Sequence, residues 1–188
     1  LVFGSTTKSR WSYGCSKALD EHLAMAWYRR MELPVRIPRF FNTIGPRQRG
    51  KWGMVVPRFV EAALSNKPLL VYGDGAQTRC FCDVRDTVPM LLELMNTPDS
   101  IGMSVNVGSD VPITILALAE LIIATLNSNS KIEFRTIDNA YGVGFEDLQD
   151  RQPDLTRLTS LIGEKDKIPL HTTITSIAES RVMRLENR

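Results

Sequence analysis

Apolar residues recur at helical spacing in several stretches of the chain, and short β-type runs separate these stretches. Residues 12–31 predict a helix because Leu19, Leu23, Ala26 and Trp27 repeat at this spacing among polar neighbours. Further helices are expected in MVVPRFVEAALSNK, RDTVPMLLELMNTP, PITILALAELIIATLNS and, once or twice, in the segment that begins DLTRLTS. Strands are expected in LPVRIPRFFN, PLLVYGDGAQT, RCFCDV, MSVNVGS and KIEFRTI. Strands that alternate with helices predict an α/β architecture.

Composition narrows the classes of function. The chain has 188 residues, 43% of them hydrophobic, which is enough for a domain with a substantial core. Its net charge of +2 gives no electrostatic reason to expect nucleic acid or an anionic membrane as a partner. No apolar run approaches the length that spans a bilayer. We therefore expect no nucleic-acid and no membrane partner.

The cysteines favour a reducing compartment. There are three, Cys15, Cys80 and Cys82, an odd number without the spacing of a disulfide framework, so we expect a cytoplasmic protein. Cys80 and Cys82 could share one face of a strand, but a metal site would need two more ligands. Because His22 and His171 have no metal-like spacing, we expect no metal and a structural role for both thiols.

Tyr13 and Lys17 form a candidate catalytic pair. At positions i and i+4 of a helix their side chains share a face, with Gly14 and Ser16 leaving room for a bound molecule. A lysine ammonium stabilises a phenolate, so it lowers the pKa of a tyrosine from its usual value of about 10. Such a tyrosine can take a proton from a hydroxyl as a hydride leaves the same carbon. The alternative is a chance pair on an ordinary amphipathic helix.

Four further motifs follow this pair in a fixed order: PRFFNTIGPRQ, VVPRFVEAAL, PLLVYGDGAQTRCFCDVRD and DRQPDLTRLTSLIG. The ordered set resembles the extended short-chain dehydrogenase/reductases that act on nucleotide sugars, the epimerase/dehydratase family. This family includes enzymes like UDP-glucose 4-epimerase and the UDP-glucuronate decarboxylases. The resemblance extends from residue 1 to about residue 163.

The resemblance implies NAD as the cofactor and assigns roles near it. Tyr13 would be the catalytic acid/base, and Lys17 would hold the nicotinamide ribose and lower the pKa of Tyr13. Phe41 would pack near the nicotinamide. Asn42 would form a hydrogen bond to the sugar or phosphate of the substrate.

The resemblance also assigns the nucleotide end of the substrate. Val56 would offer backbone N–H groups of a helix start to the diphosphate, and Tyr72 would lie against the base. Arg79 and Arg151 would clamp the diphosphate, since a guanidinium forms bidentate contacts with phosphate. From the residues alone, Phe41 and Tyr72 could equally be core aromatics, and the two arginines could be solvated surface charges.

The glycine-rich dinucleotide fingerprint is absent. Gly73-x-Gly75 and Gly142-x-Gly144 do not complete it, and neither forms a first strand-to-helix turn. We therefore expect the C-terminal part of a Rossmann-like doubly wound fold plus a small nucleotide-sugar-binding subdomain. Residues 1–50 would be the C-terminal remnant of the NAD-binding domain, with the helix of Tyr13 and Lys17. Residues 51–188 would be mainly the substrate subdomain, with some segments returning to the Rossmann sheet. The opening Leu-Val-Phe resembles the end of a buried strand, so the natural protein is expected to be longer.

The leading functional hypothesis is an NAD-dependent epimerase that acts on a UDP-sugar through transient oxidation at C4. The first alternative is a UDP-glucuronate decarboxylase, but such enzymes often carry arginine directly after the motif lysine, where this chain has Ala18. A dehydratase of the same family is another. A non-catalytic chain that binds nucleotide sugars or only dimerises is the alternative from a different class. The helix of Tyr13 resembles the one with which this family forms dimers, so a homodimer through this helix is expected.

Overall fold

The computed structural model describes residues 4–8, 10–50, 54–136 and 149–186. The strand end expected at residues 1–3 and the Gly-x-Gly at residues 142–144 lie outside these ranges. The helices are α1 (Arg10–Met31), α2 (Val55–Leu64), α3 (Val84–Asn96), the 3-10 turn η2 (Pro98–Ser100), α4 (Ile115–Thr125), α6 (Thr156–Ile162) and α7 (Leu170–Glu186). The strands are β1 (Ile37–Phe40), β2 (Thr43–Ile44), β3 (Leu69–Tyr72), β4 (Thr78–Cys80), β5 (Cys82–Asp83), β6 (Ser104–Val107), β7 (Pro112–Thr114), β8 (Ile132–Arg135) and β9 (Asp150–Arg151).

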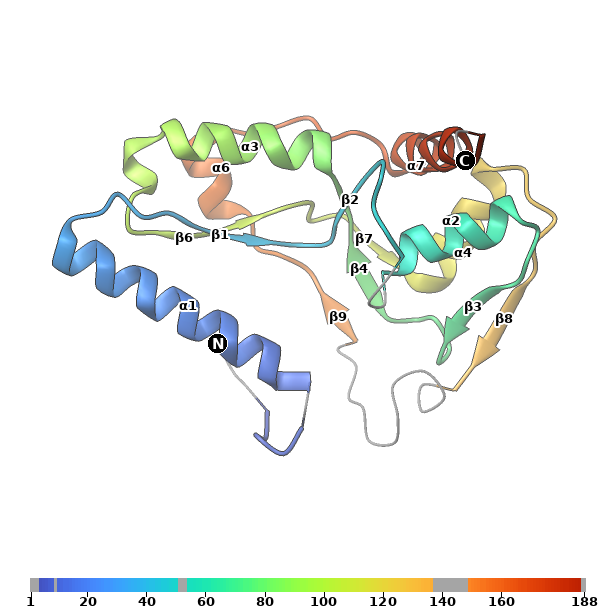
Figure 1. Ribbon diagram of the computed structural model, residues 1–188, viewed down its shortest axis with the longest axis horizontal. Coiled ribbons are helices and arrows are strands. Elements are labelled where there is room, and N and C mark those ends of the chain that lie inside the picture. Colours follow the sequence, from blue (N-terminus) through green and yellow to red (C-terminus); the bar gives the residue numbers. More distant parts are fainter. Residues whose placement is uncertain (1–3, 9, 51–53, 137–148, 187–188) are drawn as a thin grey trace.

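One end of the molecule is a layered unit built around the parallel pair β1–β6. Figure 1 shows α1 on one side of this pair and α3 and α6 on the other. The inner side chains of β6, Val105 and Val107, are buried against α3 and α6. Their alternation with the half-buried Ser104 and Asn106 is the period-two pattern of a strand that contacts a core on one face.

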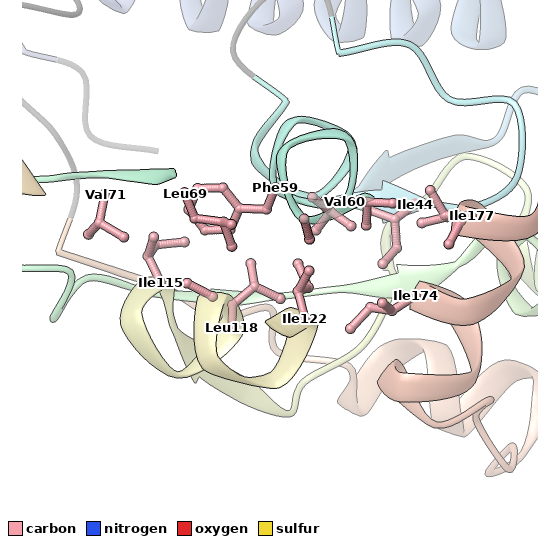
Figure 2. Packing of buried hydrophobic residues seen from close by; sticks show 14 residues of the cluster. Ile44, Phe59, Val60, Leu69, Val71, Ile115, Leu118, Ile122, Ile174 and Ile177 are labelled. Atoms are coloured by element: carbon pink, nitrogen blue, oxygen red, sulfur yellow. The ribbon is translucent and has the colours of Figure 1, made fainter. Parts of the chain in front are cut away.

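The other end contains the larger core, formed by α2, α4 and α7 together with β3, which pairs in parallel with β8. Leu118, Ile122, Ile174 and Ile177 are completely buried where the three helices meet (Figure 2). Burial of one such side chain contributes about 1.5–3 kcal/mol, so this cluster dominates the stability of this end. The cluster fixes the position of α2 and, with it, the position of the backbone N–H groups at the start of α2.

A short three-stranded sheet of order β7-β4-β9 and the two-stranded pair β2–β5 join the two ends. The segment RCFCDV was expected to be one strand, but it is divided at Phe81 into β4 and β5. The division has a physical cause, because β4 pairs with β7 and β9 whereas β5 pairs with β2. Among the described strands, only β4–β7 is antiparallel, so the expected α/β architecture with parallel pairing is confirmed.

Helix α1 orients its polar and apolar residues in an unusual way. Its apolar residues Leu19, Leu23 and Trp27 are 59%, 53% and 55% exposed, and Met31 is 60% exposed. Glu21, in contrast, faces β1 and bonds to its arginine, Arg39. The helix was predicted correctly, but its apolar stripe faces away from β1–β6. No helix in the described ranges is long and apolar enough to cross a membrane.

Candidate active site

Tyr13 and Lys17 lie on one face of α1, as their spacing predicts. The Lys17 ammonium lies 5.8 Å from the centre of the Tyr13 ring and 2.7 Å from a carboxylate oxygen of Asp20. The hydrogen bond to Asp20 and its charge raise the pKa of Lys17 above its ordinary value. Tyr13 is 71% exposed, so a substrate can reach its hydroxyl. The geometry permits proton transfer at Tyr13 beside a permanent cation.

A bidentate ion pair joins the helix of this pair to β1. Arg39 donates from Nε and Nη2 to the two carboxylate oxygens of Glu21, at 2.7 and 2.6 Å. These hydrogen bonds hold the pKa of Glu21 below its ordinary value, although partial burial opposes them. The pair therefore sets where α1 lies relative to the strand that leads to Phe41.

Phe41 and Asn42 follow directly after β1. The Phe41 ring lies 5.5 Å from the guanidinium carbon of Arg151, a cation–π contact. Asn42 has a φ of 31°, a left-handed conformation that asparagine tolerates better than most residues. Its side-chain amide nitrogen donates to the carbonyl oxygen of Cys80 at 2.8 Å, and its backbone carbonyl oxygen accepts from the N–H of Cys82. Asn42 is thus fixed against the strand segment that carries Arg79.

Arg79 and Arg151 are brought together from distant parts of the sequence. They are register partners on the parallel strands β4 and β9. Arg79 also donates from Nη1 to the carbonyl oxygens of Thr78, at 2.6 Å, and Gln149, at 3.2 Å. Phe41, Asn42, Arg79 and Arg151 consequently form one cluster, which we call the arginine cluster.

Val56 and Tyr72 lie on the neighbouring elements α2 and β3. The Val56 side chain is 1% exposed and belongs to the core, so Val56 can offer a ligand only its backbone. Met54, the residue that precedes α2, caps no N–H with its side chain, whereas Asp83 and Thr114 cap α3 and α4. The first N–H groups of α2 thus lack the side-chain acceptor that the other two helices have.

The sequence-predicted residues therefore fall into three groups: Tyr13 with Lys17 on α1, the arginine cluster, and Val56 with Tyr72. The hydrogen bonds and the ring contact of Tyr13 and Lys17 with described residues lie within α1. Their roles in catalysis and binding stay predictions. Within the described ranges, no group of three His, Cys, Asp or Glu residues is placed to hold a metal ion.

Sequence reasoning missed the supports of these groups. Asp83 is fully buried and accepts hydrogen bonds from the side chain and backbone of Arg85 and from the Thr173 hydroxyl of α7. Arg58, the fourth residue of α2, donates to the Tyr72 hydroxyl. An aspartate directly before a helix could have indicated the first support, because aspartate is a favoured N-cap residue. No local signal pairs Asp83 with Thr173.

The layered β1–β6 unit and the clustered site define an α/β protein of the Rossmann-like class. The chain belongs to the NAD dependent epimerase/dehydratase family, whose sequence model matches residues 3–108. This family assignment confirms the resemblance that the ordered motifs indicated. NAD dependence is a property of the family as a whole.

Several curated relatives are decarboxylases by name. The chain is 41% identical over 161 residues to UDP-N-acetyl-alpha-D-glucosaminuronate decarboxylase of Bacillus cytotoxicus, covering 85% of this chain and 50% of that protein. It is 40% identical over 158 residues to UDP-glucuronic acid decarboxylase 4 of Arabidopsis thaliana, covering 84% of this chain and 34% of that protein. The chain thus spans half or less of the length of these relatives.

Solved structures share the fold. Pal from Bacillus thuringiensis is 28% identical with a TM-score of 0.80, covering 92% of this chain and 53% of that one. UDP-glucuronic acid 4-epimerase from Bacillus cereus, in complex with UDP-glucuronic acid and NAD, is 24% identical with a TM-score of 0.79. The match between the two covers 92% of this chain and 52% of the epimerase chain. At this identity, the likeness to the epimerase speaks for the fold alone.

Proposed function

We propose that the protein carrying this chain is an NAD-dependent decarboxylase of a UDP-linked uronic acid. The sequence alone put an epimerase first, and the relatives named above favour the decarboxylase instead. The structural observation that carries the proposal is the arginine cluster. Two guanidinium groups at register-partner positions, beside an aromatic ring, suit a doubly anionic diphosphate.

In the proposed reaction, Tyr13 takes the proton of the C4 hydroxyl of the sugar, and Lys17 keeps a positive charge beside the phenolate. The bound dinucleotide supplies a hydride acceptor. The side chains of Tyr13 and Lys17 are exposed, so a dinucleotide and a sugar can reach them. Phe41, directly after β1, offers the nicotinamide an apolar face.

The oxidised sugar is a β-keto acid. Its carboxylate leaves as CO2 while the bonding electrons remain on the sugar as an enolate, which is then protonated. Tyr13 would then give its proton back to the C4 oxygen as the same hydride reduces the C4 ketone, which would restore the C4 hydroxyl. The loss of CO2 itself needs from the chain only a proton donor for the enolate carbon and a rigid hold on the substrate.

The hold on the substrate comes from the remaining groups. The uncapped N–H groups at the start of α2 and the guanidinium groups of Arg79 and Arg151 bind the diphosphate. Tyr72 lies against the uracil. The amide nitrogen of Asn42 is already engaged by Cys80, so its carboxamide oxygen is the atom that meets a hydroxyl of the substrate.

The test uses the full-length protein with UDP-glucuronate and with UDP-N-acetylglucosaminuronate. A decarboxylase releases CO2 and forms a product lighter by the carboxyl group, whereas an epimerase forms an isomer of unchanged mass. The isomer is the second candidate product because Ala18 replaces the arginine that decarboxylases often carry. Mass spectrometry and NMR of the nucleotide product separate the two outcomes.

We also propose that the protein is a cytoplasmic homodimer. The apolar stripe of Leu19, Leu23, Trp27 and Met31 on α1 offers a second copy a helix face to pack against. The free thiols of Cys15, Cys80 and Cys82 are compatible with a reducing compartment. Sedimentation velocity of the full-length protein tests the dimer, and a Leu23→Glu, Trp27→Glu double variant should be monomeric.

A further inference from the structure

Arg58 and Tyr72 make two contacts at once. The guanidinium nitrogen Nη2 of Arg58 donates to the Tyr72 hydroxyl at 3.2 Å. The guanidinium carbon also lies 5.7 Å from the centre of the Tyr72 ring. A planar guanidinium at this distance attracts the electron-rich face of an aromatic ring. One side chain therefore engages both the polar tip and the π-system of the tyrosine.

Arg58 does not serve as a structural ion-pair residue in the described part of the chain. The nearby Arg181 of α7 pairs with Glu61 of α2 at 2.8 Å, but no described carboxylate lies within ion-pair distance of Arg58. The first turn of α2 contains no acidic residue either. A cation close to the positive end of a helix dipole, without a carboxylate, is unfavourable for folding alone. This placement points to a role in binding.

The backbone of Tyr72 is already fixed without Arg58. Tyr72 is the register partner of Arg135 on β8, and the next N–H, of Gly73, donates to the Arg135 carbonyl at 2.9 Å. The Gln77 side chain donates to the Tyr72 carbonyl at 3.0 Å. The contacts of Arg58 are with the hydroxyl and the ring of Tyr72, so they limit the rotation of the ring about its side-chain bonds.

We propose that Arg58 is a positioning residue that holds the Tyr72 ring as a platform for the pyrimidine base of the substrate. Arg58 occupies one side of the ring, so the base stacks on the other. This inference rests on the proposed function, because it requires a nucleotide at Tyr72. It adds a residue, Arg58, and a mode of action through Tyr72.

The test measures the affinity of the full-length protein for UDP by calorimetry in a double-mutant cycle. Arg58→Ala should weaken UDP binding about tenfold, since base–aromatic stacking is of this size. Tyr72→Phe removes the hydroxyl that Arg58 holds and should cost a few-fold. The double variant should bind no more weakly than Arg58→Ala alone, because both changes remove one interaction. Arg30→Ala, an exposed arginine of α1, is the matched control and should bind like wild type.

Two further readouts separate positioning from a structural role. Arg58→Gln keeps an amide donor for the hydroxyl and should lose less affinity than Arg58→Ala, and it replaces that variant if Arg58→Ala does not fold. KM for the nucleotide sugar should rise while kcat stays near the wild-type value. Losses that add in the double variant, or unchanged UDP affinity in Arg58→Gln and Arg58→Ala, would overturn the inference. Failure of the wild-type protein to bind UDP would instead overturn the proposed function.

Discussion

Arg79 and Arg151 stand side by side on parallel strands, each the register partner of the other. Like charges opposite each other on a sheet repel, so this arrangement does not favour the fold by itself. Each arginine has a separate support: the Phe41 ring for Arg151, and the Thr78 and Gln149 carbonyls for Arg79. The supports keep both guanidinium groups in place for an anion.

Replacement of either arginine by glutamine should therefore weaken nucleotide binding without weakening the fold. We expect Arg79→Gln and Arg151→Gln each to lower UDP affinity by about tenfold or more, the size of a lost charge-assisted hydrogen bond. Calorimetric titration with UDP measures the loss, and Arg30→Gln is the control. Thermal unfolding should change little. A large fall in Tm with unchanged UDP affinity would assign both residues to the fold instead.

Tyr13→Phe should abolish turnover and spare binding. A positioned proton donor and acceptor contributes about a hundredfold or more to a rate, and the substitution removes only the hydroxyl. Product formation and UDP affinity should be measured on the same preparation of the full-length protein. Tyr28→Phe is a matched control on the same helix, where the ring packs against Gly102. Wild-type turnover in Tyr13→Phe would exclude Tyr13 as the acid/base.

Glu21→Gln should loosen α1 from β1. The substitution removes the charge from the two hydrogen bonds with Arg39 and should cost about 1–2 kcal/mol of unfolding free energy near pH 7. Since the pKa of Glu21 is lowered in the folded protein, this contribution is present above the unfolded pKa, about 4.3, and is lost as the pH falls through the folded value. Urea unfolding at several pH values measures it. Glu179→Gln, exposed on α7, should have no such effect.

Asp83→Asn should cost more. Burial raises the pKa of the Asp83 carboxyl, but the hydrogen bonds from Arg85 and Thr173 outweigh it, so the folded pKa lies below the ordinary value. Loss of charge from a buried, hydrogen-bonded carboxylate costs about 1.5–3 kcal/mol. Arg85 adds little to this cost, because its side chain is 45% exposed and stays solvated in the variant. The difference between wild type and variant should be full above the unfolded pKa of about 3.9 and shrink as the pH falls through the folded value. Asp99→Asn, exposed in η2, is the control for urea unfolding. A pH-independent difference would contradict this account.

The long helices and the buried strands could be predicted from the sequence because their patterns are local. The helix expected at residues 12–31 is found at Arg10–Met31, and MSVNVGS contains the strand Ser104–Val107. The direction in which a helix faces is not local. The apolar residues of α1 fit a core-facing stripe, yet Glu21 is the residue that meets β1, because Arg39 offers it two donors.

The short strands could not be predicted. β2, β5 and β9 have two residues each, fewer than any period can mark, and exist only through pairing across the chain. For the same reason the sequence named Arg79 and Arg151 as a clamp only through a family resemblance. Their adjacency depends on the pairing of β4 with β9. Arg58 lacked even that signal, since its relation to Tyr72 is a contact between a helix and a strand.

Cys80 and Cys82 lie on the strand segment that bonds to Asn42, so the reactivity of their thiols reports on opening of the arginine cluster. Cys80 and Cys82 are buried, and burial raises the pKa of both thiols, so each is poor in the thiolate that reacts. Cys15 is exposed on α1. A thiol reagent should therefore modify Cys15 at once and the other two only when β4 and β5 separate from Asn42. The rate of the slow labelling phase therefore measures local opening at the arginine cluster, and a bound nucleotide should lower this rate.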